Sequence, residues 1–150
     1  MTHQQLHEAM RWSAAERGDF RAMFPRLHID VDPRSTWSMD HVSCGRGWRA
    51  LIERVFAVAE ADRDARVGQV KEKWGSLRIY FDKRGSDSAL WRLVTEMQKE
   101  SETTCEACGA PGSLVQLPSS WMKTLCVSHL PDGASRIPDL ANAGPVDDIL

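Results

Sequence analysis

Four side chains in the C-terminal third of the chain have the types and spacing of metal ligands. Cys105 and Cys108 form a C-x2-C pair, and Cys126 and His129 form a C-x2-H pair. Two ligands at this spacing fit one tight turn whose backbone amides can point at the thiolates, and Gly109 permits the positive φ that such a turn needs. Soft thiolates with one imidazole, in a closed set of four, favour zinc. The sequence therefore predicts a structural Zn2+ site.

The 17 residues between the two pairs are expected to form a hairpin. Apolar stretches at 114–117 and 121–125 flank Pro118-Ser119-Ser120, an arrangement like that of a zinc ribbon or treble clef. Two other interpretations are unrelated buried cysteines beside a surface histidine, and a redox-active C-x2-C pair. The redox interpretation is disfavoured because the motif does not follow a βαβ pattern. A catalytic zinc would keep an open position, which four protein ligands argue against.

A second pair with ligand spacing, His41 and Cys44, lies upstream and could contribute to metal binding. The preferred interpretation makes Cys44 a small buried apolar residue at a helix entry. Gly45-Arg46-Gly47 matches only part of a phosphate-binding loop, so a glycine-permitted turn into the next helix is preferred.

Hydrophobic periodicity predicts the helices around this segment. Apolar residues at i, i+3, i+4 spacing predict helices over residues 4–17, 47–61 and 86–102, with Gly18 as the stop of the first. Residues 19–45 hold two prolines and no sustained period, so they are expected to be mostly irregular.

Residues 67–81 predict a β-hairpin with a type II′ turn at Gly75-Ser76. This turn pairs Trp74 with Leu77, Glu72 with Ile79, and Val70 with Phe81 on the core face. Glu72, the one polar residue of that face, is expected to be a paired carboxylate.

The outer face of the hairpin carries a cluster of basic residues. Lys71, Lys73 and Arg78 are expected there beside Tyr80, with Lys73 directly opposite Arg78. Such a cluster could bind an anionic surface, either a nucleic-acid backbone or an acidic patch on a protein partner. The alternative is a solvated face with neighbouring acids from the tail or a loop.

Composition excludes several classes of protein. Nineteen Lys and Arg against 21 Asp and Glu give a formal net charge of -2, which excludes a strongly basic coating protein and an acidic DNA mimic. Neither an apolar run long enough to span a membrane nor a signal peptide is visible, so a cytoplasmic protein is expected. Six Trp against one Tyr and four Phe give a small domain much buried area per side chain.

The order of motifs resembles a family of short, uncharacterised proteins from bacteriophages and bacterial genomes. The matching segments are CGRGW at 44–48, VKEKWGSLRIY at 70–80, CEACG at 105–109 and KTLCVSH at 123–129. The chain departs from the family pattern at Ser76, where a second Gly is common, and at His129, where Cys is common. The resemblance covers roughly residues 44–130 and implies a phage or prophage setting, but no activity.

Together these features predict an α+β fold, with helices packed on a two-stranded antiparallel hairpin and a C-terminal zinc-ribbon or treble-clef-like module. The expected divisions are a body at 1–103, a zinc-binding module at 104–130 and an acidic, loosely ordered tail at 131–150. The expected function is that of a small intracellular zinc-binding protein of phage or prophage origin, which docks a host protein without catalysis, for instance as an inhibitor of a bacterial defence system, and has no small-molecule substrate. The alternatives are nucleic-acid binding through the basic face and a metal-dependent hydrolase or nuclease, although no catalytic motif of those classes is present.

Overall fold

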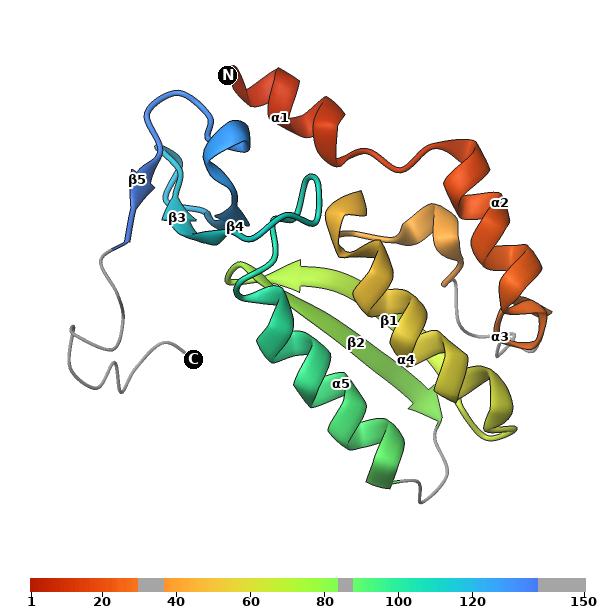
Figure 1. The fold of residues 1–150 in the computed structure, drawn as a ribbon. Helices are drawn as coiled ribbons and strands as arrows, with labels where there is room; N and C mark the ends of the chain where they lie inside the picture. Colours follow the sequence, from red (N-terminus) through yellow and green to blue (C-terminus); the bar gives the residue numbers. More distant parts are fainter. Residues whose placement is uncertain (30–36, 84–87, 138–150) are drawn as a thin grey trace.

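The computed structural model describes residues 1–29, 37–83 and 88–137 and confirms the α+β architecture. Five α-helices accompany a two-stranded hairpin and a small three-stranded sheet in the described residues (Figure 1). The helices are α1 His3–Met10, α2 Ala14–Met23, α3 Pro25–Ile29, α4 Arg49–Ala61 and α5 Ser88–Ser101. The strands are β1 Arg66–Lys73, β2 Ser76–Lys83, β3 Ser113–Gln116, β4 Met122–Leu125 and β5 Ser135–Arg136.

The N-terminal segment forms two helices where the sequence predicted one over 4–17. The Ser13 side chain accepts a hydrogen bond from the Glu16 amide at 3.0 Å, and Glu16 Oε1 accepts one from the Ser13 amide at 3.1 Å. This capping box starts a new helix, α2, which continues through Gly18 to Met23. The expectation of an irregular segment over 19–45 is therefore wrong in its first part, where α2 continues and α3 follows; residues 30–36 lie outside the described residues.

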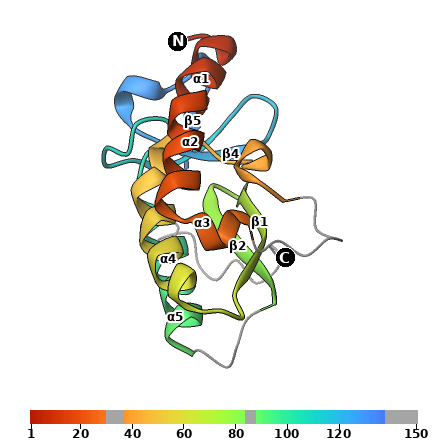
Figure 2. The same ribbon diagram turned by 90° about the vertical axis from the view of Figure 1, so that its right-hand side faces the viewer.

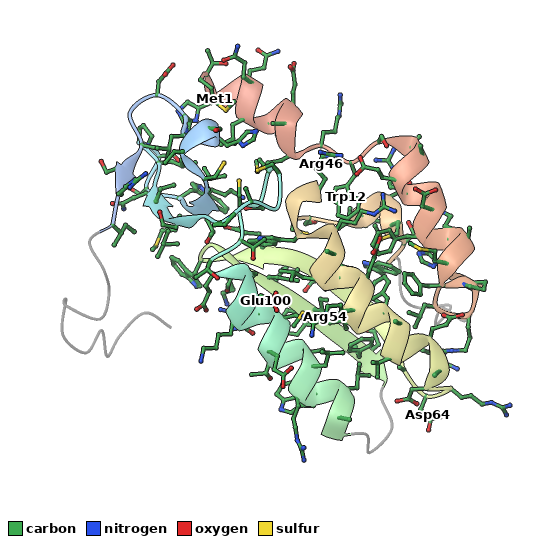
Figure 3. All side chains as sticks on the ribbon, viewed as in Figure 1. Met1, Trp12, Arg46, Arg54, Asp64 and Glu100 are labelled. Atoms are coloured by element: carbon green, nitrogen blue, oxygen red, sulfur yellow. The ribbon has the colours of Figure 1, made fainter. Side chains whose placement is uncertain are left out.

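Helix α4 confirms the apolar stripe and provides one wall of the main core. Its buried residues are Leu51, Ile52, Val55, Phe56 and Ala59. Helices α4 and α5 lie on the same face of the β1–β2 hairpin (Figures 1 and 2). The core faces of both strands pack beneath them, as do the aromatic residues of α2 and its flanks: Trp12, Phe20 and Phe24. Figure 3 shows side chains filling the space between the helices and the hairpin, with Trp12 labelled beside α2.

The hairpin forms with its core face as expected, but its turn lies one residue earlier. The register pairs Glu72 with Leu77 and Val70 with Ile79, so the turn residues are Trp74 and Gly75. Their φ angles of 57° and 77° give a type I′ turn in place of the predicted type II′. The partners expected for Trp74, Glu72 and Val70 are therefore wrong. Moving the turn by one residue changes the partner of each strand residue by two positions. Because side chains alternate between the two faces of a strand, every residue except Trp74 stays on its predicted face.

The new register also changes the pairing of cations on the outer face. Lys71 lies opposite Arg78, while Lys73 lies opposite Ser76, so the predicted Lys73–Arg78 opposition is wrong. The Lys71 ammonium lies 5.6 Å from the centre of the Tyr80 ring, and Arg78 Nε donates to Ser76 Oγ at 3.1 Å. Two like charges directly opposite each other destabilise a sheet.

Replacing Arg78 with Glu is therefore expected to stabilise the protein. The new carboxylate lies opposite Lys71 and should raise the free energy of unfolding by about 0.2–1 kcal/mol, as measured by urea denaturation. Lys73→Glu is the matched control, because it faces Ser76 and gains no cross-strand cation. A larger gain from Lys73→Glu than from Arg78→Glu would contradict the observed register.

The small sheet has the strand order β4-β3-β5 and extends beyond the expected zinc-binding hairpin. Strand β5 pairs with β3 through Val115–Arg136 and Gln116–Ser135, and the Ile137 amide donates to Leu114 O at 3.3 Å. The first part of the expected loose tail is thus attached to the sheet, because a polar segment can still pair its backbone with an open strand edge. Residues 138–150 lie outside the described residues. We call residues 104–137 the C-terminal module.

Helix α1 packs against the C-terminal module and away from the main core. Leu6 is buried in the same apolar cluster as Val115 and Leu125 of the module. The Asp132 amide donates to Met1 O at 2.7 Å, and the Met1 ammonium lies 3.3 Å from Asp132 Oδ1. The start of the described chain therefore covers one side of the module (Figure 1).

Candidate metal centre and the adjoining surface

The first pair of cysteines lies in a tight turn between α5 and β3. The Gly109 amide donates to Cys105 O at 2.9 Å, and the Cys105 amide donates to Ala110 O at 2.7 Å. Gly109 has a φ of 81°, the positive value that the motif predicted. The turn therefore presents the Cys105 and Cys108 thiols from one short loop.

The second pair follows β4 directly. A short 3-10 turn over Val127–His129 begins after Cys126, and the His129 amide donates to Cys126 O at 3.1 Å. The pairing of Ser113 with Leu125 and of Gln116 with Met122 holds β3 and β4 together. Because of this hairpin, the second turn lies against the first.

The four side chains predicted as ligands converge on one point. Their ligand atoms all lie within 4.8 Å of one another, so this group could hold a metal ion. The Sγ atoms of Cys108 and Cys126 are 3.7 Å apart, and Cys126 Sγ lies 3.2 Å from His129 Nδ1. A tetrahedron with a Zn–S bond of about 2.3 Å has edges of about 3.8 Å. The cluster therefore has nearly the dimensions of a four-coordinate site.

The electrostatic surroundings of the thiols differ within the metal-free cluster. Burial raises the pKa of Cys105 to about 11, although hydrogen bonds from nearby backbone amides oppose this. Burial also acts on Cys126, but hydrogen bonds from His129 and the neighbouring thiols outweigh it and lower its pKa to about 7. A bound cation would stabilise all three thiolates together, which is the usual coupling between metal binding and proton release.

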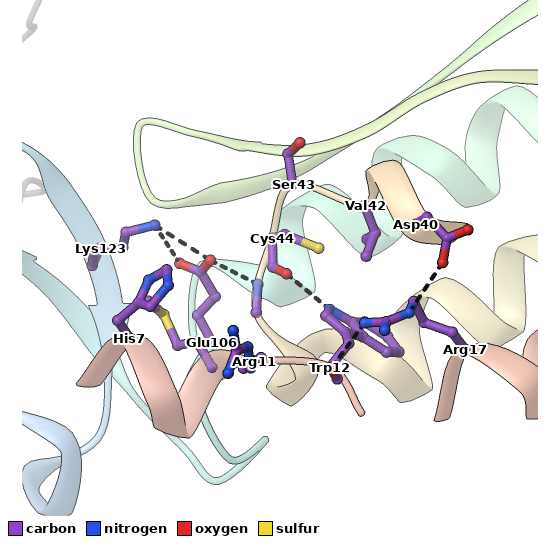
Figure 4. Close-up of a pocket in the computed structure, with 12 residues that line it drawn as sticks. His7, Arg11, Trp12, Arg17, Asp40, Val42, Ser43, Cys44, Glu106 and Lys123 are labelled. Atoms are coloured by element: carbon purple, nitrogen blue, oxygen red, sulfur yellow. Dashed lines mark hydrogen bonds and ion pairs between the residues drawn. The ribbon is translucent and has the colours of Figure 1, made fainter. Parts of the chain in front are cut away.

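A buried ion-pair network lies next to this cluster, and the sequence did not predict it. Lys123 Nζ on β4 lies 3.2 Å from Glu106 Oε1 and 3.7 Å from Glu72 Oε1 (Figure 4 shows the Lys123–Glu106 pair). The side chains of Glu106 and Glu72 are 1% and 4% exposed. The expectation that Glu72 is a paired carboxylate is confirmed. Burial raises the pKa of Glu106, while Lys123 lowers it.

Glu106 also fixes the module to the entry of α4. Its Oε2 accepts a hydrogen bond from the Gly45 amide at 2.9 Å, and its backbone carbonyl accepts one from Gly47 at 2.8 Å. A Cβ at Gly47 would lie 2.2 Å from Cys105 O, so only glycine permits this approach. The Gly45-Arg46-Gly47 segment is thus a contact with the module, consistent with the preferred turn interpretation.

Cys44 and His41 do not belong to the four-residue cluster. Cys44 packs against the main core, and its carbonyl accepts a hydrogen bond from Trp12 Nε1 at 2.9 Å (Figure 4). Burial raises the pKa of the Cys44 thiol well above its ordinary value. His41 is exposed at the end of a short 3-10 turn, Met39–His41. The structure therefore supports the interpretation of Cys44 as a packing residue.

The hairpin tip and the β3–β4 loop form a shared surface beside the module. Trp74 at the tip and Trp121 in the loop are 48% and 64% exposed. Both line one groove, with Lys71 and Lys73 from β1 on its side. The sequence predicted Trp74 on the core face of the hairpin, which is wrong because Trp74 lies in the turn. Tyr80 and Arg78 lie on the same outer face of the hairpin as the two lysines.

No protein-family model, curated protein or solved structure matches this chain. Among the described residues, no helix is both long enough and apolar enough to cross a membrane.

Proposed function

We propose that Cys105, Cys108, Cys126 and His129 hold a structural zinc ion. Three thiolates and one imidazole are a donor set that zinc prefers. Their ligand atoms lie within 4.8 Å of one another, close enough to surround one ion, and two of the cysteines are buried. With four protein donors the coordination shell is complete, as in structural sites.

The expected result for this site is one zinc per chain in freshly purified, reduced protein, measured by elemental analysis. Cys44→Ala should retain the zinc, because this cysteine lies outside the cluster. Metal-free protein that is nonetheless fully folded would contradict the proposal.

We further propose that the protein acts without catalysis, by docking a protein partner through the outer face of the hairpin. One observation carries this proposal: Lys71, Lys73 and Arg78 share that face, and none of them makes an ion pair within the part of the chain that the structure describes. Unneutralised cations beside exposed aromatic rings are typical of interaction surfaces. The resemblance to phage proteins favours a bacterial host protein as the partner.

The same cations could contact a nucleic-acid backbone, but the chain's formal net charge of -2 provides no general attraction for a polyanion. The test is capture of partners by immobilised zinc-loaded protein from a bacterial extract, followed by binding measurements with the purified candidate. Arg78→Glu should weaken a genuine complex while leaving the fold intact. A purified nucleic acid that binds where no protein does would overturn the choice of partner.

A further inference from the structure

The groove between the hairpin tip and the β3–β4 loop is concave and mostly apolar. Its floor and walls include Trp74, Trp121 and Met122, and its volume is about 430 Å³. This is within the range of about 300–1,000 Å³ that is typical of ligand sites. The groove therefore has room for a large apolar side chain.

Both loops that border the groove have unfavourable backbone conformations. Trp74 has a φ of 57° and Ser120 a φ of 74°, and they are the two non-glycine residues with positive φ in the described part of the chain. A large residue such as tryptophan is rarely found in this conformation, where asparagine or glycine is preferred. Strain of this kind concentrates at binding sites, where it is tolerated for function.

The charges around the groove are predominantly positive. Lys71 and Lys73 line it and have no ion-pair partner among the described residues. The one carboxylate in its lining, Glu72, is 4% exposed and paired with Lys123. An occupant with apolar and acidic groups would thus be complementary in both shape and charge.

We infer that this groove binds a segment of the partner protein that inserts an apolar side chain between Trp74 and Trp121 and places carboxylates on Lys71 and Lys73. The inference rests on the proposed docking function and adds the chemistry of the partner. Tryptophan side chains at the centre of an interface commonly carry much of the binding energy. A concave apolar lining with few cations favours a peptide over a single-stranded nucleic acid, which would need a longer positive track.

The experiment is selection of binders from a random peptide library by the zinc-loaded 150-residue chain, with affinities of the selected peptides measured afterwards. The selected peptides should combine an aromatic or large aliphatic residue with neighbouring Asp or Glu. Trp121→Ala should weaken their binding by about tenfold or more. Trp74→Asn should do the same, because asparagine retains the type I′ turn while removing the indole.

Trp91→Ala is the matched control, since Trp91 is an exposed tryptophan on α5 outside the groove. It should leave the affinity unchanged, and zinc content and circular dichroism should be the same in every variant. Selection of no peptides, selection of peptides without acidic residues, or equal binding by Trp121→Ala would overturn the inference. Trp121-dependent binding of an oligothymidylate in place of any peptide would also overturn it. A captured host protein that binds Trp121→Ala equally well would overturn the groove assignment while leaving the docking function standing.

Discussion

Replacing Cys108 with serine is expected to unfold the C-terminal module while the main core stays folded. The module has few buried apolar residues of its own, and its three strands contain four, four and two residues. So small a sheet is marginal without a further source of stability. Zinc binding supplies about 10–16 kcal/mol in small zinc-dependent domains, and here it would connect both turns of the module.

Cys108→Ser is expected to lower the zinc affinity by at least about 100-fold. Mutating a residue that only hydrogen-bonds to a metal ligand can already lower metal affinity by about 10–100-fold. Hydrogen exchange followed by mass spectrometry should show lost protection over residues 104–137. Helix α1 should also lose protection, since Leu6 packs in the module. Helix α4 and the β1–β2 hairpin should remain protected, because their aromatic core does not include the module.

Cys44→Ser provides the comparison, since it also changes one thiol to a hydroxyl but lies outside the cluster. It should leave protection of the module unchanged. Persistent protection of residues 104–137 in Cys108→Ser would show that the module is stable without four ligands.

The metal cluster could be predicted from the sequence because each ligand pair is local. Residues three positions apart in a tight turn present their side chains together whatever the rest of the fold does. Helix α4 could also be predicted, because its apolar residues follow helical spacing along its whole length. Both features depend on residues that are close together in the sequence, so they can be predicted from the sequence alone.

The position of the hairpin turn could not be predicted because distant residues determine it. Gly75 lies under the module, where its carbonyl accepts a hydrogen bond from Thr124 Oγ1 at 2.7 Å. An added Cβ at Gly75 would lie 2.5 Å from Leu114 Cδ1. These contacts join residues about 40–50 positions apart in the sequence. They favour a type I′ turn at Trp74-Gly75, although tryptophan is not a residue that this turn prefers. The break between α1 and α2, in contrast, had a local signal in the capping sequence at Ser13 and Glu16 that periodicity concealed.

Replacing Lys123 with methionine is expected to destabilise the protein by about 3 kcal/mol, because it leaves two buried carboxylates without their cation. Lys123 pairs with Glu106 of the module and Glu72 of the hairpin, so it joins the two parts through two carboxylates whose side chains are 1% and 4% exposed. Methionine retains most of the apolar length of lysine, which limits the loss of packing. Urea denaturation of the zinc-loaded protein measures the change in the free energy of unfolding.

Two further variants determine whether the cause is electrostatic. Lys73→Met removes an exposed lysine without an ion pair in the described residues and should change the stability by no more than about 0.5 kcal/mol. Glu106→Gln combined with Lys123→Met should be more stable than the sum of the two single changes, since the unpaired negative charge is removed while the Gly45 amide keeps an acceptor. Strict additivity of the two changes would show that the Lys123–Glu106 contact contributes only packing. Coupling between them would show that Lys123 neutralises the buried Glu106 carboxylate, and it is this Glu106 side chain that accepts the hydrogen bond from Gly45 and so fixes the C-terminal module to the entry of α4.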